Sequence, residues 1–173
     1  AAGELSRAAA LETISTFPRH RFVERLNGDP RADVGFISRR GIKLERQPLL
    51  AHLQRPFMSR AEMQKSRYLA VVRGNDVASS FFWTMNSGSL GLVMDTPFES
   101  FASAHFRPWE HYVPFKEDMS DFDTVFDWCE AHERECEEMT RRAAETCRLL
   151  LRHDLRAMVS AGVISGLRKA LRG

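Results

Sequence analysis

Hydrophobic residues in this chain form short continuous runs near the middle of the sequence and recur at helical spacing towards its end. The run that begins at Tyr68 and the run over residues 90–94 have the length and composition of buried strands. A turn of small residues follows the first run and leads into a segment that can open a helix. We therefore predict one β-α-β unit, with its ligand-binding edge at the carboxyl end of the first strand.

The first third of the chain carries weaker patterns. Residues 4–14 have helical composition, and Pro18 is predicted to end that helix. Residues 34–37 form an apolar island that fits an edge strand, and residues 39–47 are basic and loop-like. The S-x-x-E pattern that begins at Ser59 predicts a capping box and a short helix that delivers the chain into the first strand.

Strand and helix patterns also alternate after residue 94. Pro97 is well placed to start a helix that continues to residue 104, and residues 111–113 fit a short strand closed by Pro114. Ser120 or Asp121 can cap a helix over 122–132. This alternation predicts an α/β fold, a parallel sheet flanked by helices.

The last part of the chain is strongly helical. A charged helix is expected from residue 133, with an inward stripe, and a further helix over 155–171. The stripe consists of Met139, Ala143, Cys147 and either Leu150 or Leu151.

Composition narrows the classes of function. The 173 residues suffice for one core with extensions, and 25 Lys and Arg against 23 Asp and Glu give no electrostatic case for nucleic acid binding. The three cysteines match no zinc spacing, and their odd number favours buried thiols over a closed disulfide set. No apolar run is long enough to span a membrane.

Two features bear on the origin and compartment of the chain. It begins on alanine, which indicates a piece of a longer protein, and its first residues lack the pattern of a signal peptide. Thiols without a signal favour the cytoplasm. A lumenal location in the secretory pathway remains the alternative.

The turn after the first strand has the features of a phosphate site. A strand that ends in a glycine turn beneath a helix N-terminus presents unpaired backbone N–H groups and the positive end of the helix dipole. Gly74 and Ser79 stand at the corresponding places. The same residues also fit an ordinary turn and helix cap, so both interpretations remain open.

Three blocks of sequence resemble the C-terminal half of the glycosyltransferase family 90 domain. They are RYLAVVRGNDVASSFFWTMNSGS, DTPFESF and FRPWEHYVPFKEDMSDF, the last followed by the helical DWCEAHE. This family holds protein O-glucosyltransferases, fungal capsule-associated proteins and bacterial lipopolysaccharide-modifying enzymes. The order and spacing of all three blocks match the family, and the PW-x-HYVP pattern is the most specific of them.

The resemblance implies the Rossmann-like, donor-binding half of a GT-B glycosyltransferase with a helical C-terminus. The implied reaction transfers glucose or xylose from a UDP-sugar to a hydroxyl of a protein or polysaccharide, without a metal or other cofactor. The implied division is an N-terminal segment and linker over 1–58, the nucleotide-binding domain over 59–153 and a C-terminal helix over 154–173. The implied substrate-binding residues are Gly74, Asn75, Asp76, Val77, Ala78, Ser79, Ser80 and Glu99.

Within this set the resemblance implies two roles. The loop over residues 75–80 would wrap the donor diphosphate with backbone N–H groups, and Glu99 would accept hydrogen bonds from the ribose hydroxyls. An alternative for Glu99 is a first-turn acid that a helix dipole favours.

Two departures from the family pattern affect the catalytic prediction. Family members commonly carry Arg or Lys in or just after this loop, where this chain has SFFW from Ser80 onward. Arg73 or Arg67 would have to supply the missing charge. The family's N-terminal half, with the acidic residue that acts as general base, has no counterpart here, so no catalytic residue is assigned. Two interpretations remain open: the donor-binding part of an enzyme, or a degenerate or truncated relative that serves as a non-catalytic binding module.

Overall fold

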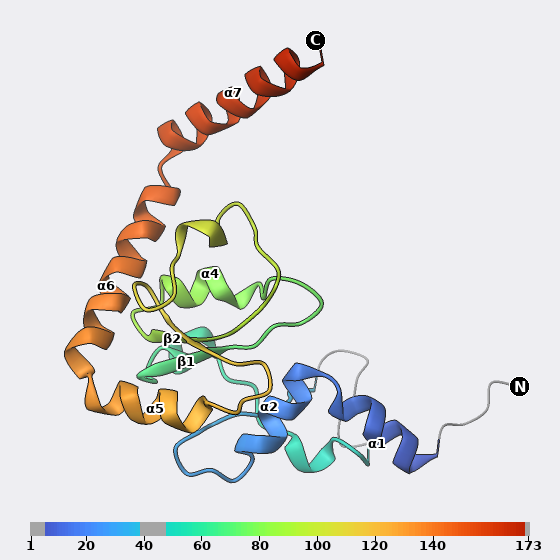
Figure 1. Cartoon of the computed structure of the whole chain (residues 1–173). Helices are drawn as coiled ribbons and strands as arrows, with labels where there is room; N and C mark the ends of the chain where they lie inside the picture. The colour runs from blue at the N-terminus through green and yellow to red at the C-terminus, as the bar shows by residue number, and fades with distance from the viewer. Residues whose placement is uncertain (1–5, 39–47, 172–173) are drawn as a thin grey trace, which may run out of the picture.

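A computed structural model describes residues 6–38 and 48–171 of the chain. Its elements form a small parallel sheet with helices on both faces, followed by one last helix that leads away from the sheet (Figure 1). The helices are α1 (Arg7–Ser15), α2 (Pro18–Leu26), α3 (Arg60–Met63), α4 (Ser80–Met85), α5 (Phe122–Ala131), α6 (Glu133–Leu150) and α7 (His153–Ala170), with short 3-10 turns η2 (Ala51–Leu53) and η3 (Ser103–His105).

The sheet confirms the predicted parallel α/β architecture. Its strands are β1 (Tyr68–Val71), β2 (Leu90–Met94) and β3 (Val113–Phe115), in the order β1-β2-β3, and both pairings are parallel. Helix α4 connects β1 to β2, so the predicted β-α-β unit is present. Strand β2 is central and buried along its whole length. This burial explains its continuous apolar run, because a parallel strand that is covered on both faces has apolar side chains on both faces.

Alternate residues of β2 enter two different layers of the core. Leu92 packs with residues of α2 and α5, whereas Val93 packs with residues of α4 and α6. Figure 1 accordingly shows α4 on one side of the sheet and α5 on the other. Gly91 allows α4 to approach closely, because a Cβ atom at this position would lie 2.5 Å from the Cε atom of Met85.

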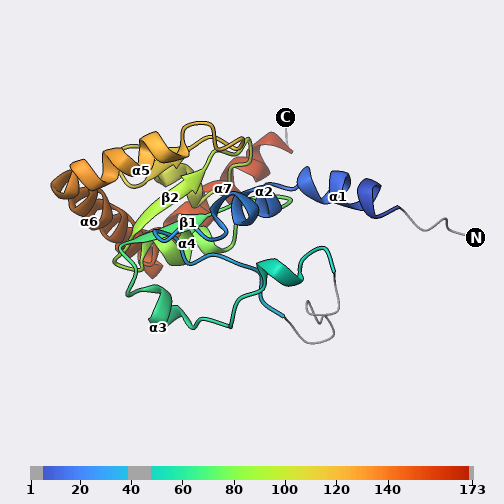
Figure 2. The ribbon, with the colours of Figure 1, turned by 90° about the horizontal axis from the view of Figure 1, so that it is seen from below.

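The N-terminal part contains a helix that the sequence did not predict. Pro18 does not end the helical region; it is the first residue of α2, where its missing N–H group is not needed. Phe22 and Leu26 of this helix are buried in the same core as the sheet residues. Helix α2 lies beside the sheet, and α1 extends away from it (Figure 2).

The predicted edge strand at 34–37 is not formed. Phe36 makes only an isolated parallel bridge with Gln54. The predicted capping box is confirmed, since the Ser59 side chain accepts from the Glu62 N–H and the Glu62 carboxylate accepts from the Ser59 N–H. The predicted basic loop over 39–47 lies outside the described residues.

Two predictions between β2 and α5 were wrong. Residues 97–104 do not form a helix, and only the short turn η3 is present. The Ser100 and Ser103 hydroxyls bond to each other and to backbone groups of this segment, which competes with helical hydrogen bonds. Pro114 does not close the third strand but lies within it, and this is tolerated because β3 is an edge strand of the described sheet.

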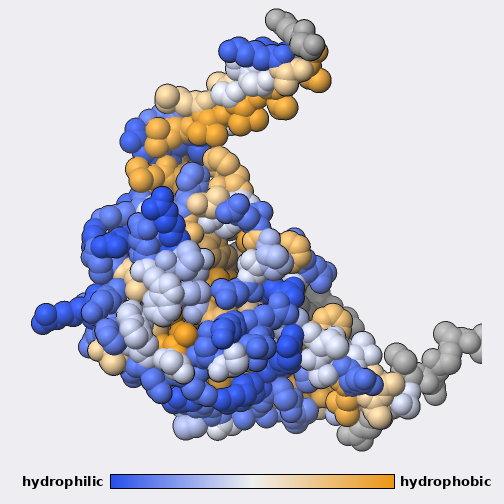
Figure 3. Space-filling view, in the orientation of Figure 1, coloured by the Kyte–Doolittle hydropathy of each residue, from blue (hydrophilic) through white to orange (hydrophobic). Residues whose placement is uncertain are grey.

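The C-terminal helices follow the predicted pattern. Residues 136, 139, 143 and 147 of α6 are buried, and Leu150 is half-buried whereas Leu151 is 61% exposed, so the stripe ends at Leu150. The three cysteines are free and buried. Helix α7 has no buried residue and leads away from the sheet (Figure 1), with apolar side chains along one side (Figure 3). Among the described residues, no helix is both long enough and apolar enough to cross a membrane.

Candidate functional site

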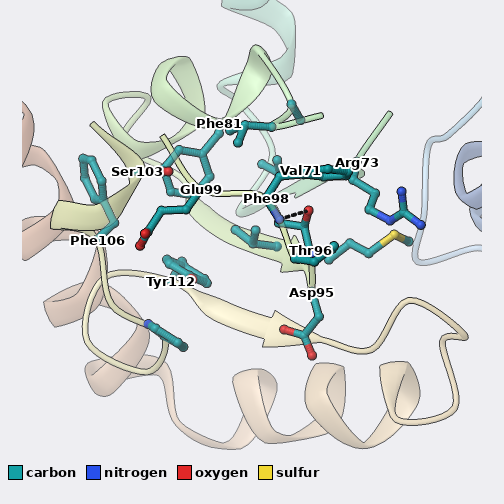
Figure 4. A pocket seen from close by; sticks show the side chains of 16 residues that line it. Val71, Arg73, Phe81, Asp95, Thr96, Phe98, Glu99, Ser103, Phe106 and Tyr112 are labelled. Atoms are coloured by element: carbon teal, nitrogen blue, oxygen red, sulfur yellow. Dashed lines mark hydrogen bonds between the residues drawn. The ribbon is translucent and has the colours of Figure 1, made fainter. Parts of the chain in front are cut away.

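A cavity of about 480 Å³ lies where β1 and β2 end, at the carboxyl edge of the sheet. Ligands of parallel α/β domains bind at this edge. Figure 4 shows Arg73 at one end of this first cavity and Glu99 with Phe106 at the other. The lining residues are Val71, Arg73, Val77, Ala78, Phe81, Val93, Met94, Asp95, Thr96, Pro97, Phe98, Glu99, Ser103, Phe106, Pro108 and Tyr112.

The loop after β1 contributes to this cavity and to a second one. Val77 and Ala78 line the first cavity. Gly74 and Asn75 line the second cavity, which has a volume of about 600 Å³ and also reaches Arg73. The remaining predicted residues of the loop line neither cavity and are exposed: Asp76, Ser79 and Ser80.

Glu99 lines the first cavity from the loop that follows β2. It does not lie in a helix, so the alternative of a first-turn acid does not apply. The loop is held locally, because the Phe98 N–H donates to the Thr96 hydroxyl over 3.2 Å (Figure 4). The Glu99 carboxylate is thus a hydrogen-bond acceptor on the wall opposite Arg73.

Of the two arginines that were considered as replacements for the family's basic residue, only Arg73 lies at the site. It follows β1, lines both cavities and donates to Glu117 from Nε over 2.8 Å and from Nη2 over 2.7 Å. Arg67 precedes β1 and pairs with Glu130 and Glu133 at the opposite edge of the sheet. Because the two arginines stand at opposite ends of β1, only Arg73 lies at the carboxyl edge of the sheet.

Sequence reasoning missed two further arginines, both on α2. A Cβ atom on Gly74 would lie 3.2 Å from Nη2 of Arg19, and Arg21 lies 3.3 Å from the Glu117 carboxylate that Arg73 also contacts. Arg21 and Arg73 thus share the Glu117 carboxylate, and the Arg19 guanidinium lies beside the same loop. This cluster was not predicted, because α2 itself was not predicted and lies far from Gly74 along the chain.

The segment that begins at Asp95 adds a carboxyl group with altered acidity. Partial burial, and then the nearby Asp121 carboxylate, raise the pKa of Asp95 above its usual value. Burial and the Asp95 carboxylate raise the pKa of Tyr112, which lines the same cavity. Asp95 directly follows β2. This position in the sequence was the signal that could have placed Asp95 at the carboxyl edge of the sheet.

Aromatic side chains form the apolar wall of the first cavity. The buried Phe81 ring packs edge-on against Phe106 and Tyr112. Phe81 is therefore a core residue of α4. Phe82 is 37% exposed and Trp83 packs under Arg60, so α4 presents no cation to the site from the positions where the family carries one.

His111 has a structural role. Its Nδ1 accepts from the Arg107 N–H over 3.0 Å, and its Nε2 lies 3.1 Å from the Thr146 hydroxyl of α6. These bonds fix the loop that leads to Tyr112. Across residues 6–38 and 48–171, no group of three His, Cys, Asp or Glu is arranged to hold a metal ion.

The cavity therefore lies at the edge where parallel α/β sheets bind ligands, with an arginine at one end and a carboxylate at the other. The sequence over residues 46–156 matches the family described as Glycosyl transferase family 90. The chain belongs to this glycosyltransferase family, as its sequence blocks predicted.

Individual relatives agree with this assignment. The chain is 29% identical to O-glucosyltransferase LpsA of Dichelobacter nodosus over 128 residues, 73% of this chain and 38% of that protein. It is 30% identical to protein O-glucosyltransferase 3 of Rattus norvegicus over 87 residues, 50% of this chain and 17% of that protein. The uncharacterized protein 027R of Frog virus 3 (isolate Goorha) is 27% identical over 90 residues, 49% of this chain and 9% of that protein. The matches thus span well under half the length of each of these relatives.

Proposed function

We propose that this chain is the donor-binding part of a GT-B glycosyltransferase that uses a UDP-sugar. The observation that carries the proposal is the placement of Arg73 and Glu99 at opposite ends of one cavity at the carboxyl edge of the sheet. The names of two relatives, both O-glucosyltransferases, support glucose as the transferred sugar, and xylose is the second choice. The acceptor would be a hydroxyl of a protein or polysaccharide.

In this proposal the nucleoside occupies the first cavity. The ribose hydroxyls donate to the Glu99 carboxylate, and the base lies against the aromatic wall that contains Phe106 and Tyr112.

The diphosphate would lie against the loop after β1. Backbone N–H groups of residues 75–80 and the Arg73 guanidinium would stabilise the charge of the departing UDP without a metal ion. Glu117 already neutralises part of the Arg73 charge, but Arg19 and Arg21 add positive charge at the same place. The base that deprotonates the acceptor would come from an N-terminal half that has no counterpart among these residues.

A second function is favoured by one observation. The first turn of α4 carries Ser80, Phe81 and Phe82 in place of the family's cation, and charge-assisted contacts to phosphate are roughly twice as strong as neutral ones. A degenerate relative that keeps the fold as a binding module would show the same substitution. The two functions differ in whether UDP binds.

A matched pair of arginine variants tests the proposed site. Arg73→Gln is expected to weaken UDP binding by about tenfold or more, because a hydrogen bond to a charged group contributes about 1.5–3 kcal/mol. Glu117 keeps Arg21 as a partner, so the variant is expected to fold. The control Arg67→Gln removes an equally charged residue at the opposite edge and is expected to leave the affinity unchanged. Equal effects of both variants in titration calorimetry would reject the phosphate role of Arg73.

A further inference from the structure

The second cavity, of about 600 Å³, lies on the other side of Arg73 from the nucleoside site. It is formed where the first turn of α2 meets the loop after β1. Arg73 lines both cavities, so the two are neighbours along one surface. The size of the second cavity is in the usual range for small-ligand sites.

Its polar lining comes from α2 and from the loop. The Arg19 guanidinium stands over Gly74, and the positive end of the α2 dipole points the same way because Pro18 is the first residue of that helix. The Phe17 N-cap makes no side-chain capping bond. The exposed Asn75 adds a side-chain amide that can donate and accept.

A buried histidine in this wall has, within the described part of the chain, no hydrogen bond at one ring nitrogen. His20 lines the cavity and is only 8% exposed. Among the described residues its Nε2 has no hydrogen-bond partner, and the Glu24 carboxylate lies 3.9 Å from it, beyond hydrogen-bond distance. Buried polar groups without partners are rare, and one in a cavity wall is often completed by a ligand or water. The His20 ring stacks on Phe36, so polar and apolar surfaces adjoin in this wall.

The order of the groups in a nucleotide sugar indicates which of them would lie in this cavity. The diphosphate links the nucleoside to the sugar, so a nucleoside in the first cavity and a diphosphate at Arg73 direct the sugar towards the second cavity. A sugar ring has hydroxyl groups around its edge and C–H groups on its faces. The amide of Asn75, the imidazole of His20 and the rings of Phe17 and Phe36 match these two kinds of surface.

We propose that the second cavity holds the transferred sugar of the donor, with Asn75 and His20 as hydroxyl partners. This inference rests on the proposed function. It assigns the sugar to a place formed by α2, outside the β-α-β unit that carries the nucleotide.

A cavity-filling variant tests the assignment. Thr16 lines the second cavity and is exposed, whereas Thr13 is exposed on the same helical segment and lines neither cavity. Thr16→Trp is expected to weaken UDP-glucose binding by at least about tenfold, equal to about 1.4 kcal/mol, and to change UDP binding by less than about twofold. The control Thr13→Trp is expected to leave both affinities unchanged. Thermal unfolding of both variants checks that they fold.

The outcomes separate this inference from the proposed function. If the unsubstituted chain binds neither UDP nor UDP-glucose, the proposed function fails and the sugar assignment fails with it. If the chain binds UDP, and Thr16→Trp keeps UDP-glucose affinity or loses affinity for UDP and UDP-glucose equally, the sugar assignment is overturned while the nucleotide site stands. Selective loss of UDP-glucose affinity supports both.

Discussion

Arg73 shows how strand direction determines the role of a single residue. Arg67 and Arg73 flank the same strand, and composition alone does not distinguish them. Because ligands bind at the carboxyl ends of parallel strands, only the residue after β1 reaches the cavity. The sequence therefore contained the information that placed Arg73, Glu99 and Asp95 at one edge. It did not contain the contact of Arg19 with Gly74, which depends on long-range packing of α2.

The raised pKa of Asp95 gives a prediction on pH-dependent stability. A raised pKa means that the folded state binds more protons than the unfolded state above the usual pKa of 3.8, so the carboxyl contributes less stability as pH rises through this window. Asp95→Asn is expected to raise the free energy of unfolding at pH 7 by up to about 0.5 kcal/mol and to have no effect at pH 3. Urea unfolding at the two pH values measures the difference.

Asp118 supplies a control of opposite sign. Its carboxylate accepts from the Ser120 N–H over 3.0 Å, and this bond lowers the pKa of Asp118. The stability that this group contributes is present above its usual pKa and is lost as pH falls through the lowered value. Asp118→Asn is therefore expected to destabilise at pH 7 and to lose its effect in acid. A gain at neutral pH for both variants would contradict the assignment of Asp95.

At the scale of elements, the predictions were right where the apolar pattern was clear. They were wrong where a proline or side-chain hydroxyl groups determined the local backbone structure. Strands β1 and β2 and helices α5 and α6 have clear apolar patterns and were predicted. Pro18 was interpreted as a helix end although proline is equally suited to the first helical position, and the two roles look alike in sequence. In residues 97–104, the backbone N–H groups of Ser100 and Ser103 donate to the hydroxyl of the other serine, and these bonds compete with the hydrogen bonds of a helix.

Helix α7 is an element whose removal the fold should tolerate. It buries no residue, and its principal packing partner is α6. A chain that ends at residue 152 is expected to have a melting temperature within about 2 °C of the full chain, a change below about 1 kcal/mol. Differential scanning calorimetry provides the measurement.

A longer truncation is the matched control. A chain that ends at residue 142 also removes Ala143 and Cys147, which are buried in the core layer that contains Phe81 and Val93. This truncation is expected to lower the melting temperature by more than about 5 °C or to abolish cooperative unfolding. A similar loss from both truncations would show that α7 contributes to the stability of the fold.

At the scale of the whole molecule, one surface joins elements from distant parts of the sequence. The β-α-β unit supplies the first cavity, whereas α2 completes the second. Core residues such as Phe22 and Leu53 come from the N-terminal segment and pack with β2 and α5, so that segment contributes to the fold around the site. The β-α-β unit was predicted from the continuous apolar runs of its strands, but the helix α2 that adjoins it was not.

Calorimetric titration of the chain with UDP, with ADP as the comparison, tests the central claim most directly. The account predicts saturable binding of UDP, at least about tenfold tighter than ADP, since the proposed first cavity accommodates a uridine nucleoside between Glu99 and the aromatic wall. Absence of UDP binding, or equal affinity for UDP and ADP, would contradict the assignment of this chain as the donor-binding part of a UDP-sugar glycosyltransferase.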